Sequence, residues 1–154
     1  MTADLRIERH IDQTPESCFD LWTHPDQVAQ WWGPKDYAGQ PFKARVEAWS
    51  LTAGEAWAIS MTAPDGTVFS QSGTFLEVER PRMIRLSFAW LENGQRGPET
   101  EIRVAFNPDG NGTRLVFEQL GFADTATRDV HIQGWQECLD RFARAGLDLM
   151  QVRQ

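Results

Sequence analysis

The stretch that decides the fold is residues 113–149, TRLVFEQLGFADTATRDVHIQGWQECLDRFARAGLDL, in which one hydrophobic period gives way to another. Residues 113–120 read as a strand whose inward phase is Leu115, Phe117 and Gln119. From about residue 125 the spacing becomes helical, which predicts a helix over 125–150, about 37 Å long and able to cross a whole sheet. Its apolar face comprises Ile132, Trp135, Leu139, Phe142, Gly146 and Leu149. The opposite face, which we expect in solvent, carries Arg128, Asp140, Arg141, Arg144 and Asp148.

Upstream, further strand-like runs are separated by short turns such as Pro64-Asp65-Gly66, which favours an antiparallel meander. These runs are residues 4–11, 42–49, 55–62, 67–79, 83–90 and 100–107. Two short helices are predicted after the first run, beginning at Thr14-Pro15-Glu16 and His24-Pro25-Asp26 and ending at Gly33-Pro34. The predicted fold class is α+β: a curved antiparallel sheet of about six to seven strands, wrapped around a long C-terminal helix.

Strand alternation also predicts which side chains face that helix. Residues 67–79 are ambiguous, because Gln71, Gly73 and Phe75 lie on one face while Val68 and Leu76 lie on the other. We therefore expect this strand to be covered on both faces. The inward set on the other strands is Trp57, Ile59, Met61, Ile84, Leu86, Phe88, Trp90, Ile102, Val104, Phe106, Leu115, Phe117 and Gln119.

Composition indicates one domain, residues 1–154, with an unusual aromatic content of seven Trp and nine Phe against one Tyr. Such rings imply a thick aromatic core, an aromatic-lined cavity, or both. The net charge of −7 and the presence of only two lysines argue against binding to nucleic acid or to anionic membranes. There is no signal peptide and no apolar run long enough for membrane insertion, so with two widely spaced cysteines we expect a cytoplasmic protein.

The order of motifs resembles the START-like, helix-grip (SRPBCC) superfamily, and in particular its branch of heat-shock-protein ATPase activator homologues (AHSA). Three stretches carry the resemblance: RIERHIDQTPESCFDLWTHPDQVAQWWGP (6–34), TAPDGTVFSQSGTFLEVERPRMIRLSFAW (62–90), and DGNGTRLVFEQLGF (109–122) followed by GWQECLDRF (134–142). The resemblance implies a helix-grip fold and usually an interior cavity for an apolar ligand. Activities within the superfamily range from lipid carriers to cyclases and chaperone activators, so the fold does not settle the function.

No motif for a nucleophile, a phosphate loop or a metal site is present, and we predict no catalytic residue, no metal and no cofactor. The histidines His10, His24 and His131 lie in different elements. We expect His10 and His24 at surface or capping positions, and we do not expect His131 to be a site residue, although it could reach a pocket mouth. The two cysteines, Cys18 and Cys138, suit small buried apolar positions. Strand residues that could place a polar group inside are Glu47, Glu77, Glu118 and Gln119.

We therefore expect a module that binds a small apolar molecule between the sheet and the C-terminal helix. The predicted ligand-binding residues are Trp32, Trp49, Trp57, Met61, Phe75, Phe88, Trp90, Phe117, Gln119, Trp135 and Leu139. Gln119 or a strand Glu would orient a polar end of the ligand, and Trp90 would gate the pocket. The alternatives are a cyclase-like or hydrolase-like enzyme using the same cavity, and an interaction module that modulates a chaperone ATPase. A homodimer is compatible with each of these hypotheses.

Overall fold

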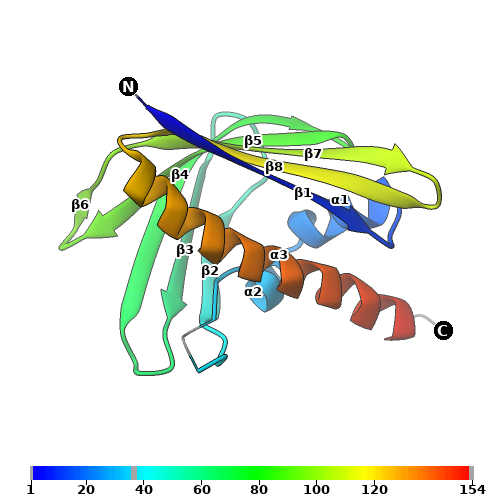
Figure 1. Ribbon diagram of the computed structural model, residues 1–154, viewed down its shortest axis with the longest axis horizontal. Helices are drawn as coiled ribbons and strands as arrows, with labels where there is room; N and C mark the ends of the chain where they lie inside the picture. The colour runs from blue at the N-terminus through cyan, green and yellow to red at the C-terminus, as the bar shows by residue number, and fades with distance from the viewer. Residues whose placement is uncertain (1, 36–37, 153–154) are drawn as a thin grey trace.

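The computed structural model describes the backbone of residues 2–35 and 38–152 and the side chains as far as residue 147. The chain begins with a strand and two short helices, continues through the remaining strands, and ends in a long helix (Figure 1). The elements are β1 (Ala3–Ile11), α1 (Pro15–Thr23), α2 (Pro25–Trp31), β2 (Lys43–Trp49), β3 (Ala56–Thr62), β4 (Val68–Glu79), β5 (Met83–Glu92), β6 (Gln95–Arg96), β7 (Thr100–Asp109), β8 (Gly112–Phe122) and α3 (Thr125–Val152).

The strands form one antiparallel sheet in the order β1-β8-β7-β5-β4-β3-β2. The short β6, which the sequence did not indicate, pairs with β5 outside this order. The first strand thus pairs with the last, and the meander unrolls from there to β2 at the far edge. The predicted α+β helix-grip architecture is confirmed.

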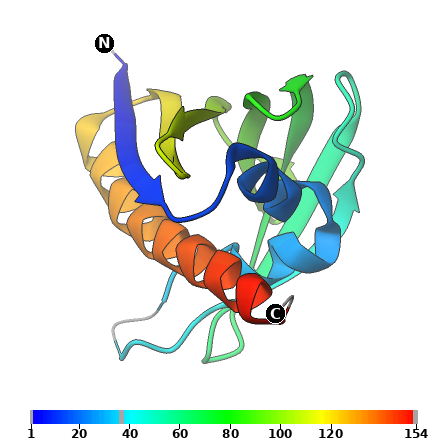
Figure 2. The same cartoon turned by 90° about the vertical axis from the view of Figure 1, so that its right-hand side faces the viewer.

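The three helices lie on the inner side of the curved sheet. Figure 2 shows α3, in orange and red, running past β1 toward α2, with α1 and α2 closing the other part of the curve. Ion pairing fixes this arrangement: Arg9 of β1 contacts Asp140 of α3 and also donates to the Gln136 carbonyl at 3.2 Å. The sheet therefore grips the helix along an edge as well as across its face.

The ends of the helices follow from local chemistry. The Thr14 hydroxyl accepts a hydrogen bond from the Ser17 amide, and Pro15 occupies the first helical position of α1, as expected. The Asp124 carboxylate accepts from the Thr127 amide at 2.7 Å and so caps the start of α3. This bond lowers the pKa of Asp124, because it favours the ionised carboxylate.

Strand β4 corrects one expectation. Gln71, Gly73 and Phe75 are buried, but Val68 and Leu76 are exposed, so only one face of this strand is covered. Both phases contain apolar residues because the pairing with β5 shifts register between Phe75 and Glu77, so that Val78, from the other phase, packs against the core. The inner phase is the one that carries glutamine and glycine.

Gly73 lets a tryptophan side chain cross β4. Trp57 of β3 lies opposite Gly73 in the sheet register, and its indole Nε1–H donates to the Ser87 carbonyl of β5 at 2.8 Å. At the same place the Thr74 amide donates to the Ser87 hydroxyl at 2.8 Å rather than to a backbone carbonyl. The ladder between β4 and β5 is thus bridged by side chains at this point, where the sheet bends over the helices.

Candidate functional site

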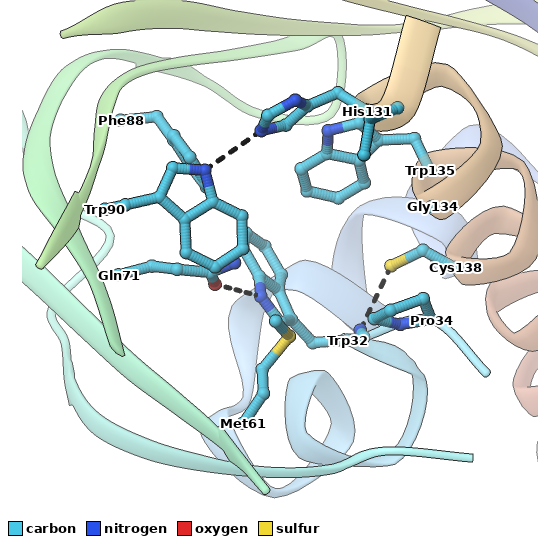
Figure 3. Close-up of a pocket in the computed structure, with 12 residues that line it drawn as sticks. Trp32, Pro34, Met61, Gln71, Phe88, Trp90, His131, Gly134, Trp135 and Cys138 are labelled. Carbon is cyan, nitrogen blue, oxygen red and sulfur yellow. Dashed lines mark hydrogen bonds between the residues drawn. The ribbon is translucent and has the colours of Figure 1, made fainter. Parts of the chain in front are cut away.

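A pocket of about 160 Å³ lies between α3, the corner after α2, and the strands β3, β4 and β5 (Figure 3). Its wall is mainly aromatic, with a thioether, a thiol, one amide and one imidazole. The lining residues are Trp32, Gly33, Pro34, Met61, Gln71, Phe88, Trp90, Val130, His131, Gly134, Trp135 and Cys138. Val130 at the rim is 73% exposed, so the pocket opens to the surface through an apolar edge.

The corner that follows α2 supplies Trp32 to this wall. Gly33 has φ +116°, a conformation that glycine adopts without strain, and this turns the chain after the two tryptophans. Arg141 of α3 holds the corner: its guanidinium donates to the carbonyls of Gly33 at 2.8 Å, Trp32 at 3.3 Å and Gln30 at 3.0 Å. The Cys138 thiol donates to the Trp31 carbonyl at 3.3 Å.

Four consecutive carbonyls, which the end of a short helix would leave without partners, are thus bonded by two side chains of α3. The expectation that Arg141 faces solvent is therefore wrong. Arg141 lies on the polar side of α3, but α2 packs there, and the carbonyls at its end accept hydrogen bonds from the Arg141 guanidinium. Burial lowers the pKa of the Arg141 guanidinium from its ordinary value, but it remains the charged donor of the corner.

Two tryptophans of the pocket each donate to a buried glutamine. Trp32 Nε1 donates to Gln71 Oε1 at 2.7 Å, and Trp135 Nε1 donates to Gln119 Oε1 at 2.7 Å. The rings of Trp32 and Trp135 meet edge to face, with centroids 5.3 Å apart. The two glutamines differ in the environment of the amide nitrogen. Gln119 Nε2 donates to Thr100 Oγ1 at 2.8 Å, whereas Gln71 is one of the residues that line the pocket.

Trp90 and His131 form the upper rim. Trp90 Nε1 donates to His131 Nε2 at 2.9 Å (Figure 3). His131 Nδ1 lies 2.8 Å from the Thr127 carbonyl. An indole can only donate and a carbonyl can only accept, so His131 is the neutral tautomer with its proton on Nδ1. Burial lowers the pKa of His131 from its ordinary value of 6.5, in keeping with this neutral state.

Protonation of His131 is expected to weaken this rim and the fold. As the pH falls below about 6.5 the unfolded chain binds the proton first, so the stabilisation is present above that pH and is lost through the lower folded pKa. Thermal unfolding of wild type and His131→Gln from about pH 8 to pH 5 should show the two melting temperatures converging on the acid side. Parallel profiles, or an NMR titration of His131 at or above its ordinary pKa, would contradict this.

Neither a thiolate nor a charged side chain is found among the described residues that line the pocket. Burial raises the pKa of the Cys138 thiol to about 12 and that of Cys18 to about 11, so neither is a thiolate near neutral pH. No Asp, Glu, Lys or Arg is among the described residues that line the pocket. Within the part of the chain that the structure describes, no group of three or more His, Cys, Asp or Glu side chains is placed to hold a metal ion.

The candidate carboxylates of the strands lie elsewhere. Glu77 pairs with Arg85 at 2.9 Å, and neither Glu47 nor Glu118 lines the pocket. His10 sits between Asp12 and Asp109 on the surface, at 3.1 and 3.2 Å. None of these groups lines the cavity, so none of them offers a general acid there.

The structure divides the predicted ligand-binding residues into two sets. Those at the pocket are Trp32, Met61, Phe88, Trp90 and Trp135. Those buried in the core beyond it are Trp49, Trp57, Phe75, Phe117, Gln119 and Leu139. The second set packs on itself: the ring centroids of Trp49 and Phe75 are 5.0 Å apart, for example. The rings thus fill most of the space between sheet and helices, and the pocket is the part they leave.

The residues that sequence reasoning did not place at the site are Gly33, Pro34, Gln71, Val130, His131, Gly134 and Cys138. Gln71 had a signal, because it lies in phase with the buried Gly73 and Phe75 on β4. For Gly134 there was no signal in the sequence other than its position one residue before Trp135. His131 was considered for a pocket mouth, and the structure places it there.

A curved antiparallel sheet closed by a C-terminal helix, with a pocket between them, defines a START-like helix-grip protein. The sequence profile of the Activator of Hsp90 ATPase homolog 1-like proteins matches residues 12–146, and the chain belongs to this family. None of the curated proteins matches the chain in sequence. No helix among the described residues is both long and apolar enough to cross a bilayer.

Solved structures agree with this assignment. The AHSA1 protein from Silicibacter pomeroyi is similar, with 27% identity over 96% of this chain and 99% of its own, and a TM-score of 0.82. A protein from Chromobacterium violaceum shares the fold at 22% identity, covering 92% and 94% of the two chains, with a TM-score of 0.81. A protein from Mycobacterium smegmatis shares it at 19% identity, covering 96% and 90%, with a TM-score of 0.78.

Proposed function

We propose that the protein binds a small apolar molecule in the pocket between α3 and strands β3 to β5. The observation that supports this most strongly is the wall itself: four aromatic rings and Met61 surround a space with an apolar opening and no charged side chain among its described lining residues. Pockets of this kind, with a few placed polar groups, are typical ligand sites. The family commonly binds ligands in such a cavity.

Burial of apolar surface would supply most of the binding free energy. For a ligand of single-ring size we expect about 4–8 kcal/mol, which corresponds to dissociation constants from about millimolar to micromolar. Rings that meet edge to face would add contacts for an aromatic ligand, and Met61 would add sulfur–ring contacts. Entry past the exposed Val130 would require no charged side chain to be desolvated.

Gly134→Leu is expected to abolish binding while the protein stays folded. A side chain at this position starts in the pocket, because the nearest atom to an added Cβ is Pro34 Cβ at 3.9 Å. Leucine should also favour α3 by up to about 0.8 kcal/mol over glycine, so the melting temperature should hold or rise. Calorimetric titration with α-methylstyrene checks the affinity, and native mass spectrometry of freshly purified wild type checks for a co-purified molecule.

The matched control is Ala126→Leu, on an exposed position of the same helix, which should leave the affinity unchanged. If wild type binds no apolar probe, or if Gly134→Leu binds as well as wild type, the proposal fails. A residue that only fills the core would lose stability on truncation and would not produce this separation of affinity from melting temperature.

The alternatives have weaker support. An enzyme would need a titratable group free to act in the cavity, but both ring nitrogens of His131 are engaged and the pKa of Cys138 is too high for a nucleophile. Modulation of a chaperone ATPase rests on the description of the family alone.

A further inference from the structure

Gln71 places a hydrogen-bond donor in the pocket. Gln71 is buried, with only 3% of the residue exposed, and its Oε1 accepts a hydrogen bond from Trp32 Nε1–H. Because an indole nitrogen can only donate, the oxygen of this amide must face Trp32, and Nε2 faces the other way. Among the described residues no acceptor bonds to Nε2, and the atom is not occluded by protein, so it borders the pocket (Figure 3).

Gln119 shows what a fully bonded glutamine looks like in the same fold. It accepts from Trp135 in the same way, but its Nε2 donates to Thr100 Oγ1 at 2.8 Å, and Thr100 in turn lies 3.4 Å from the Phe88 carbonyl. Thr100 thus provides an acceptor for the amide N–H of Gln119, whereas the amide N–H of Gln71 faces the pocket without a protein acceptor among the described residues. A ligand without an acceptor would cover Nε2 and leave a buried amide N–H without a partner, at a cost of about 1–3 kcal/mol, whereas an acceptor on the ligand avoids this cost.

The volume of the pocket and the absence of charged side chains from its described lining restrict the class of ligand further. A dry apolar cavity of about 150 Å³ in another protein holds one benzene ring, so a pocket of about 160 Å³ suits a single ring with a small substituent. With no lysine or arginine in the described lining, an ionised carboxylate would have no counter-charge. His131 does not supply one while its Nε2 accepts from Trp90.

We propose that Gln71 is a specificity-determining residue, whose Nε2–H donates to a neutral oxygen acceptor, such as a ketone or ester carbonyl, on a single-ring aromatic ligand. This rests on the proposed function and names the class of molecule that the site prefers. The ring occupies the pocket that Trp32, Phe88 and Trp135 line, and the acceptor points at Gln71 on β4.

Two probes of nearly one shape test the role of the acceptor. Acetophenone and α-methylstyrene differ only by a carbonyl oxygen in place of a methylene group. Wild type is expected to bind the ketone about tenfold more tightly, a difference worth one good hydrogen bond. Benzoate, which is anionic, is expected to bind at least about tenfold more weakly than the ketone.

In Gln71→Met the ratio of the two affinities should fall to about one, so that the preference for the ketone over α-methylstyrene disappears whatever the variant does to the affinity for both probes. Gln119→Met is the matched control: it should lower the melting temperature but keep the ketone preference. NMR of the wild type gives an independent test. The side-chain amide resonances of Gln71 should shift when acetophenone is added and should not shift with α-methylstyrene.

Equal affinities of the two probes for wild type, a ketone preference that survives in Gln71→Met, or tighter binding of benzoate would each overturn this inference while the proposed function stands. If neither neutral probe binds to folded wild type, the proposed function fails and this inference fails with it.

Discussion

Gly73→Ala is expected to lower the free energy of unfolding by about 3 kcal/mol or more, because an added methyl group meets a shorter contact here than at any other described glycine. A Cβ at this position would lie 1.8 Å from the Ser87 carbonyl oxygen and 2.6 Å from Trp57 Nε1. Both atoms belong to the bond by which the indole bridges β3 and β5, and one of them is backbone. The clash is therefore relieved only if the strands separate or the Trp57 ring leaves its place in the core.

Urea denaturation would measure this effect, with Gly97→Ala as the matched control. A Cβ at Gly97 meets the Trp90 carbonyl at 3.6 Å, an ordinary contact, and the position is exposed, so the change should stay within about 0.5 kcal/mol. Similar stabilities for the two variants would show that β4 and β5 can part at no cost. The role assigned to Gly73 in bending the sheet would then be wrong.

The fold could be predicted from the sequence because periodicity reports which face of an element is buried. Trp57, Phe88 and Phe117 each share one strand phase with other large apolar residues, and all three are buried as that phase predicts. Alternation does not report which buried side chains touch one another. Trp57 turns its indole across Gly73, and Phe117 lies against Trp135 with centroids 4.4 Å apart, so neither reaches the pocket that both were expected to line.

The polar residues of the site were harder to predict, because their positions depend on docking between elements. Gln119 was favoured over Gln71 as the group that orients a ligand. Both are buried and both accept from a tryptophan; the difference is the Thr100 hydroxyl, a neighbour across the β7–β8 pair. A sequence places Gln71 and Gln119 on inner faces, but only the packed structure shows which amide has a donor left.

Arg141 shows the same limit on α3, where a charged residue on the polar side of a helix bonds to the end of another helix. Arg141→Met is expected to lower the free energy of unfolding by about 3 kcal/mol, because methionine keeps an apolar stem and removes the charged donors to three carbonyls. Those carbonyls end α2 and would be left without a side-chain partner.

Affinity should fall together with stability in this variant, because the corner that Arg141 holds carries Trp32 into the pocket wall. Gln133→Met provides the control, since Gln133 is exposed on the same helix and its loss should cost within about 0.5 kcal/mol. Urea denaturation and titration with α-methylstyrene measure the two effects. If Arg141→Met matches Gln133→Met in both, Cys138 alone holds the corner. If stability falls while affinity is unchanged, Trp32 keeps its place without Arg141, and Gln71 is its principal anchor.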